Sequence, residues 1–226
     1  MEDLPEKEWK DYGHDSVKAG LSVVPLLGGA LATAFETVFS SPIDKRKKVW
    51  LKELASTVDE LCEKIEGLSP EKLSQNDLFV SAYLQASNIA IRTHQESKLQ
   101  ALRAAVKNTV LFEKYDESKK LIFIRIIDEM TPLHFKVLDF LSGPEKYIKA
   151  LDEKQGPNVS THWGSLGQVW DKTFNDVKSS DPLVDLVISD LHRFGFIYID
   201  QFHKASTHSV TTSTGREFIE FVSDNS

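Results

Sequence analysis

The side chains best suited to catalysis occur together in one short stretch, Arg92-Thr93-His94-Gln95-Glu96. A guanidinium, an imidazole and a carboxyl group could perform acid–base or phosphodiester chemistry if they converged in a cleft. The same spacing fits a solvated helix face or a hydrogen-bonded contact between helices, and we favour that interpretation. We therefore assign Arg92, His94 and Glu96 to a polar cluster of unknown role, with a nuclease or hydrolase as the minority alternative.

Other chemical motifs are weak or missing in the sequence. The seven histidines include no pair four residues apart, which is the spacing that places two imidazoles on one helical face for a metal. Cys62 lies beside an apolar stripe, which is typical of a buried thiol. The Gly28-Gly29 pair lacks the Lys-Ser/Thr of a phosphate-binding loop, and no G-x-S-x-G occurs. We therefore expect no enzyme, no catalytic residues, no metal, no cofactor and no small-molecule substrate.

The composition limits the class of protein. The chain has 226 residues, 27 basic and 34 acidic, for a net charge of -7, which argues against broad nucleic-acid binding. One cysteine excludes a disulfide framework. The residues from Met1 to Asp15 are polar and acidic, with no basic region before an apolar core, so no secretory signal is expected. We expect a cytoplasmic protein, with a peripheral association with the inner membrane left open.

An uncharged, glycine-rich segment, Ala19–Phe39, is the most unusual feature of the chain. No charged residue occurs in it before Glu36. A buried central helix or a glycine-kinked helical hairpin fits this composition, and we favour one of these. A membrane-inserting segment, conditional or permanent, is the alternative, although the uncharged run is short of the about 20 residues that a span requires. The side chains that would face a membrane or a partner are Leu21, Val24, Leu27, Leu31 and Phe35.

A compact basic run, Lys45-Arg46-Lys47-Lys48, follows that segment. Four cations near the start of a predicted helix oppose its dipole, which costs about 0.3–1 kcal/mol for each exposed charge. A solvated first turn would explain them, but a lipid headgroup, a phosphate or an acidic partner surface would use them. We therefore group Lys45, Arg46, Lys47 and Lys48 with the apolar segment as a membrane or partner surface.

The first two-thirds of the chain reads as amphipathic helices. Apolar residues recur at helical spacing over about 43–66, 76–94 and 96–110, of which the last two could be one continuous helix. The stretch Ser118–Met130 suits a buried helix better than a strand, although its β-branched residues keep the strand alternative open. A further helix is predicted from Thr131-Pro132 to Leu141, ended by Gly143-Pro144.

The C-terminal part has a different residue pattern, which predicts short strands as well as helices. We predict a helix within 164–178, a second helix from Asp181-Pro182 to Phe194, strands at Phe196–Ile199 and His208–Thr212, and a last helix to Val222. This order is typical of a winged-helix module. Asp185 and Asp190 on the preceding helix disfavour DNA, so a protein partner or self-association is favoured over nucleic acid.

The fold class predicted from these patterns is mainly α, an N-terminal helical bundle with a small C-terminal winged-helix-like α+β module. The predicted organisation is a polar arm over 1–15, the bundle over 16–150, a linker over 151–163 and the module over 164–226.

Part of the chain reads GLSVVPLLGG and, beyond Trp50, FVSAYLQASNIAIRTHQESKLQALRAAVKN, and its end has the pattern Thr-x-x-Thr-Gly-Arg-x-Phe. These strings resemble uncharacterised bacterial proteins that are distantly similar to the Abi-alpha type, associated with abortive infection. The resemblance covers roughly Gly20–Leu141 and the C-terminal pattern. It implies a bacterial or prophage origin and a role in antiphage defence or stress, and it supplies no catalytic residues.

The function predicted is therefore that of a non-enzymatic interaction protein, a conditional membrane-associating effector whose partners are an anionic membrane, a protein or a second copy. The alternative is a soluble adaptor or transcriptional regulator that acts through the C-terminal module.

Overall fold

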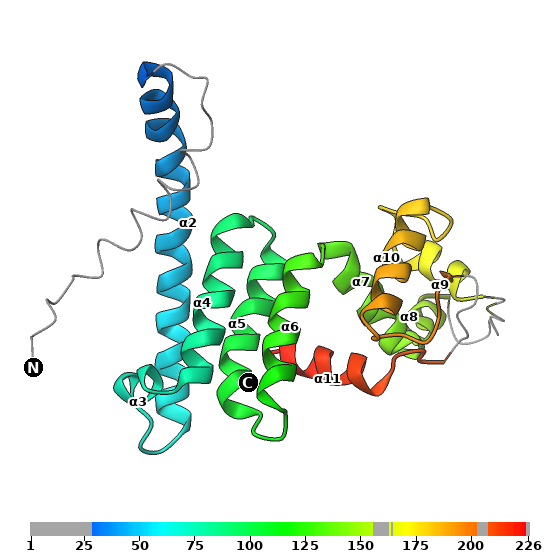
Figure 1. Ribbon diagram of the computed structural model, residues 1–226. Helices are drawn as coiled ribbons and strands as arrows, with labels where there is room; N and C mark the ends of the chain where they lie inside the picture. The colour runs from blue at the N-terminus through cyan, green and yellow to red at the C-terminus, as the bar shows by residue number, and fades with distance from the viewer. Residues whose placement is uncertain (1–28, 156–162, 164, 203–207, 225–226) are drawn as a thin grey trace, which may run out of the picture. The chain divides into compact units, whose positions relative to one another are not determined.

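The chain is mainly helical. The computed structural model describes residues 29–155, 163, 165–202 and 208–224, without the side chains of 29–39, 41 and 155. The helices are α2 (Gly29–Lys64), α3 (Pro70–Ser74), α4 (Asp77–Arg92), α5 (Glu96–Leu111), α6 (Glu117–Glu129), α7 (Pro132–Ser142), α8 (Pro144–Gln155), α9 (Leu166–Thr173), α10 (Pro182–Arg193) and α11 (Ser213–Val222) (Figure 1). The predicted helical bundle is confirmed, as is the helical alternative for Ser118–Met130.

Contacts divide the chain into two units, Met1–Lys45 and Arg46–Ser226, which are described separately. In the first unit the described residues belong to the first half of α2, which continues through Pro42 without ending. The helix therefore begins well before the predicted start at residue 43. The predicted boundary between residues 150 and 164 stays a prediction.

In the second unit, α2 buries the apolar stripe that the sequence predicts. Trp50, Leu54 and Leu61 are at most 2% exposed. The Trp50 indole Nε1–H donates a hydrogen bond of 2.9 Å to Ser87 Oγ on α4, so the largest side chain of the stripe also satisfies its polar atom. The apolar residues of the stripe recur every three or four positions, which places them on one narrow face, as in a helix packed along one side.

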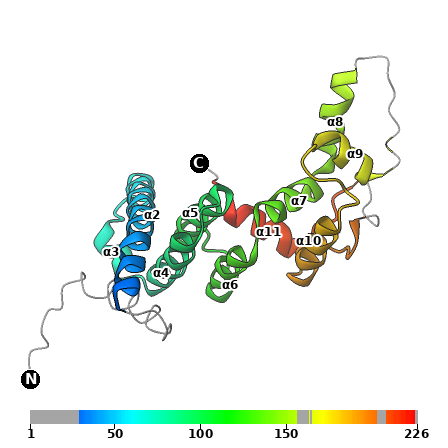
Figure 2. The same ribbon diagram turned by 90° about the horizontal axis from the view of Figure 1, so that it is seen from above.

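Helices α4, α5 and α6 pack against one another and lie side by side in Figures 1 and 2. Small side chains are buried on these helices, with Ala82 and Ala86 on α4 and Ala105 on α5 fully buried. Alanine adds little bulk and has the highest helix propensity, so these helices approach closely without losing local stability. The two helices predicted over 76–94 and 96–110 are confirmed as separate helices, and the alternative of one continuous helix is wrong, because the chain is extended at Thr93.

A cluster of aromatic rings joins α7 and α9 to the segment after α10. Phe140 of α7 lies edge-on to Trp170 of α9, with ring centroids 5.2 Å apart, and Phe202 stacks on Phe140 at 6.1 Å. The Trp170 indole donates to the Val177 carbonyl at 2.8 Å. Helix α8 was not predicted, because Pro144 ends α7 and also begins the next helix at once.

The strands predicted at Phe196–Ile199 and His208–Thr212 are not formed in the described residues. A single antiparallel bridge joins Ile197 to Thr211. Two hydrogen bonds flank it, from Tyr198 N to Val210 O at 3.0 Å and from Thr212 N to Phe196 O at 2.9 Å. The structure therefore does not support the α+β part of the winged-helix prediction.

Competing hydrogen bonds explain why the bridge does not extend. In an antiparallel pair, opposed residues exchange both N–H···O bonds. The Phe196 N–H instead donates to Leu191 O at the end of α10, and the Val210 N–H donates to Leu141 O of α7. Thr212 then starts α11 as its N-cap, because its hydroxyl accepts a hydrogen bond from Gly215 N.

Gly215 allows α11 to approach the bridge closely. A β-carbon at this position would lie 2.2 Å from the Phe196 carbonyl oxygen and 2.6 Å from Thr211 Cγ2. The first atom belongs to the backbone and cannot rotate away. Close packing therefore explains the glycine in the Thr-Gly-Arg pattern.

We predict that Gly215→Ala lowers the free energy of unfolding by about 1–3 kcal/mol, as expected when bulk is forced into a packed site. Urea denaturation followed by circular dichroism measures it. Gly143→Ala is the matched control, because its β-carbon would meet only Lys146 Cδ, at 3.9 Å. Equal losses in the two variants would show that the approach to Phe196 is not the cause.

Candidate functional site

The structure locates the predicted membrane or partner surface only in part. Leu21, Val24 and Leu27 lie outside the described residues, and Leu31 and Phe35 lie on α2 without described side chains. The assignment of these five residues to a surface therefore stays a prediction.

The basic run lies on α2 and is exposed. We call Lys45, Arg46, Lys47 and Lys48 the cationic collar. Consecutive helical residues are about 100° apart, so four of them point around most of the helix circumference. All four, with the neighbouring Asp44 and Val49, are exposed. The collar therefore presents charge in several directions and has net charge +3 with Asp44 included.

The polar cluster Arg92, His94 and Glu96 does not converge. Arg92 forms an ion pair of 2.8 Å with Asp128 on α6, and its side chain is 66% exposed. Glu96, at the first turn of α5, accepts from Arg103 at 3.1 Å. His94 is exposed between α4 and α5. Arg92 therefore lies at the end of α4 and Glu96 at the start of α5, and each pairs with a different partner, as expected for contacts between helices.

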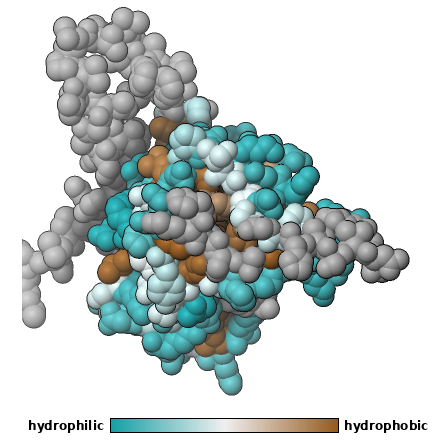
Figure 3. All heavy atoms as spheres, turned by 90° about the vertical axis from the view of Figure 1, so that its right-hand side faces the viewer, coloured by the Kyte–Doolittle hydropathy of each residue, from teal (hydrophilic) through white to brown (hydrophobic). Residues whose placement is uncertain are grey.

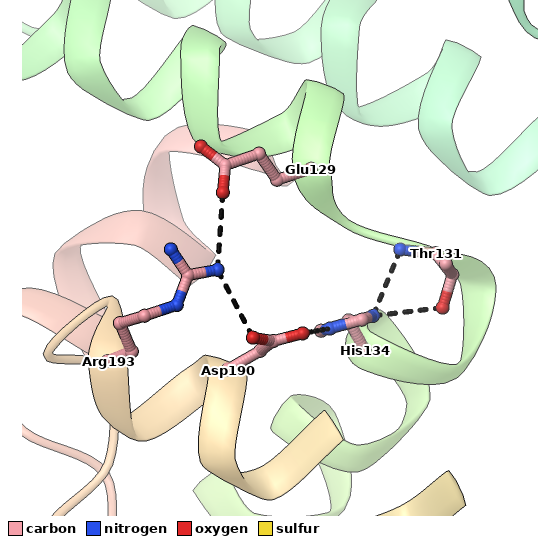
Figure 4. Close-up of polar contacts among 5 residues, drawn as sticks. All are labelled: Glu129, Thr131, His134, Asp190 and Arg193. Atoms are coloured by element: carbon pink, nitrogen blue, oxygen red, sulfur yellow. Dashed lines mark hydrogen bonds and ion pairs between the residues drawn. The ribbon is translucent and has the colours of Figure 1, made fainter. Parts of the chain in front are cut away.

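A junction of five side chains, which sequence reasoning missed, links α6, α7 and α10 (Figure 4). His134, 5% exposed, lies at its centre. Its Nδ1 accepts a hydrogen bond of 3.0 Å from the Thr131 N–H, which caps the start of α7. Its Nε2 lies 3.4 Å from Asp190 Oδ2. The Arg193 guanidinium then bridges Asp190 and Glu129, at 3.1 and 3.3 Å.

These contacts fix the protonation state of His134. A backbone N–H can only donate, so Nδ1 carries no proton and the proton resides on Nε2, facing Asp190. Burial lowers the pKa of His134 from its ordinary value of 6.5, while Asp190 opposes that shift and the positive charges of Lys98 and Arg193 reinforce it. Both nitrogens are engaged, so His134 acts as a structural link and not as a free base.

Buried lysines are a second feature that the sequence did not reveal. Lys98 donates to Asp128 O at the end of α6, and Lys120 donates to Thr109 O at the end of α5, each at 3.0 Å. Such carbonyls lack partners within their own helix, and a cation near a helix C-terminus also favours the dipole. Burial lowers the pKa of both lysines. Nothing in the local sequence distinguishes them from exposed lysines.

A cleft of ≈ 620 Å³ opens between α2 of the second unit, α5 and the chain after α11. Lys107 lies in it, 3% exposed, and pairs with Asp224 at 2.7 Å and with Glu60 at 3.1 Å. The hydrogen bond to Asp224 raises the pKa of Lys107, and this effect is larger than the opposing effect of burial. Arg103 forms ion pairs with Glu53 and Glu96. The full lining is Glu53, Ser56, Thr57, Glu60, Gln100, Arg103, Ala104, Lys107, Val222, Ser223 and Asp224.

Among the described residues, no three or more His, Cys, Asp or Glu side chains are arranged to hold a metal ion. None of the helices in the described part of the chain is long and apolar enough to cross a bilayer. No protein-family profile, curated protein or solved structure matches the chain.

We predict that His134 makes the protein less stable as the pH falls below about 6.5. The unfolded chain takes up a proton there while the folded chain resists, so the stability rises with pH between the folded and unfolded pKa values, by at most about 1.4 kcal/mol per pH unit. His134→Gln should remove this component, since glutamine at this helical position can still accept from the Thr131 N–H. The measurement is urea unfolding of both proteins at several pH values from 5 to 8. Parallel pH profiles would contradict the assignment.

Proposed function

We propose that this chain is a non-enzymatic interaction protein that associates with anionic membranes on activation, as a bacterial defence or stress effector. The apolar segment Ala19–Phe39 would insert, and the cationic collar would bind lipid headgroups. The protein would otherwise be cytoplasmic and peripheral to the inner membrane. The defence role derives from the resemblance to Abi-alpha type proteins and is part of the proposal.

The exposed collar is the observation that supports this function best. Four cations directly follow an uncharged segment, and each is exposed on α2. A basic residue near an anionic surface gains about 1 kcal/mol, so net charge +3 favours association by about 3 kcal/mol. The same interaction falls steeply with added salt, because exposed charges are screened over about 8 Å at physiological ionic strength.

Insertion of the apolar segment would supply the remaining free energy. Burying an apolar side chain gains about 1.5–3 kcal/mol whether the surroundings are protein or lipid. A trigger therefore has to change only the difference between two burials, which permits a switch between a covered and an inserted state.

We predict that the full chain binds vesicles containing phosphatidylglycerol more strongly than neutral phosphatidylcholine vesicles. Reversing the charge of all four collar residues to Glu should lower the partition coefficient at least about tenfold. Vesicle flotation at 0.05, 0.15 and 0.5 M salt measures this, and the preference should decline with salt.

The matched control replaces four exposed lysines away from the collar, Lys149, Lys154, Lys172 and Lys178, with Glu. The change in net charge is the same, so only a local site predicts different outcomes. Equal loss in both variants, or no binding of the wild-type chain to anionic vesicles, would refute the membrane proposal.

The alternative, a soluble adaptor or regulator acting through the C-terminal part, has one specific observation in its favour. Leu183 and Leu186, one turn apart on α10, are 51% and 59% exposed, and Tyr198 is 69% exposed. Figure 3 shows hydrophobic residues in brown among hydrophilic residues in teal on one face of the molecule. Exposed apolar side chains suit a protein partner or a second copy better than DNA.

A further inference from the structure

The cleft of the second unit has two polar walls. Glu53, Thr57 and Glu60 recur at helical spacing on α2, and Arg103 and Lys107 recur on α5. Side chains from the two walls meet across the cleft, through the Glu53–Arg103 and Glu60–Lys107 ion pairs. The chain after α11 closes one end with Asp224.

Charges of opposite sign lie at different depths in this cleft. The side chain of Lys107 is 4% exposed and that of Arg103 is 22% exposed, so the cations form the floor. The carboxylate side chains of Glu53, Glu60 and Asp224 are 37%, 50% and 63% exposed. A solute entering from water therefore meets carboxylate oxygens first.

The charged side chains that line the cleft favour a ligand of positive charge. The lining holds three carboxylates against two cations, and Glu96 adds a fourth carboxylate through its ion pair with Arg103. The cations of the floor are thus already neutralised, and an anion would meet repulsion at the rim. A cation is favoured, because an excess of negative charge in a cleft raises the local concentration of positive ions.

We propose that the cleft binds a linear polyamine, with its ammonium groups donating to the carboxylates of Glu53 and Glu60. These two residues are about 10 Å apart along α2 at 1.5 Å per residue, which suits several charges spaced along one flexible chain. The volume lies within the range of small-molecule sites, about 300–1,000 Å³. The side chains are not arranged for a metal ion among the described residues. This site is independent of the membrane proposal.

Spermidine is the probe for this site, titrated into the full chain by isothermal calorimetry at 0.15 M salt. Saturable binding of one molecule is expected. Glu53→Gln with Glu60→Gln should weaken it at least tenfold, while each glutamine keeps an oxygen that can accept from Arg103 or Lys107. The control is Glu145→Gln with Glu153→Gln on α8, both exposed, which changes the net charge equally and should alter binding less than twofold.

The variant Arg103→Gln distinguishes an electrostatic effect on spermidine binding from a general loss of structure in the cleft. Removing a floor cation leaves the carboxylates less neutralised, so spermidine should bind about twofold more tightly or better. A variant that only loosened the cleft would bind more weakly. Lack of saturable binding, equal weakening by both glutamate pairs, or weaker binding to Arg103→Gln would each overturn the proposal. Failure of vesicle binding would leave it unaffected.

Discussion

The buried amide of Asn108 is the contact on which the position of α11 depends. Asn108 lies on α5, is 2% exposed, and its Nδ2 donates to Phe221 O at 2.9 Å and to Ser223 O at 3.0 Å. These carbonyls end α11 and have no helical partner of their own. Buried carbonyls without partners cost about 1–3 kcal/mol each, so one amide removes a large penalty from the end of the chain.

Two consequences follow from this anchor. At the end of α11, Asp224 reaches Lys107, one residue before Asn108 in α5, and so closes the cleft of the second unit. On α11 itself, Glu220 accepts from the Tyr115 hydroxyl at 2.6 Å. The lining of the cleft therefore comes from segments far apart in sequence, and Lys107 in its floor is paired with both Glu60 and Asp224. Lys98 and Lys120 cap the ends of neighbouring helices in the same way.

Local patterns predicted the helices well where one apolar face decides the structure. The stripe of Trp50, Leu54 and Leu61 is buried as expected. The collar is exposed, but it lies in the middle of α2 and not in a first turn, because the helix begins at Gly29. The strand pair was predicted wrongly, because the Phe196 and Val210 N–H groups find partners outside the bridge. The cleft, the His134 junction and the buried lysines depend on which helices pack together. The spacing of apolar residues along the sequence does not show this. Lysine is almost never buried without a partner, so a sequence alone favours the exposed assignment.

Hydrogen–deuterium exchange of the wild-type chain and Asn108→Ala tests the role of this anchor most directly. The amides of α11 should lose protection in the variant, while those of α4 between Ala82 and Ala90, which take no part in the two Asn108 hydrogen bonds, should keep it. Substitution of the exposed Asn88 by Ala serves as the control and should change neither helix. Unchanged protection of α11 in Asn108→Ala, or equal loss in α4 and α11, would contradict the account.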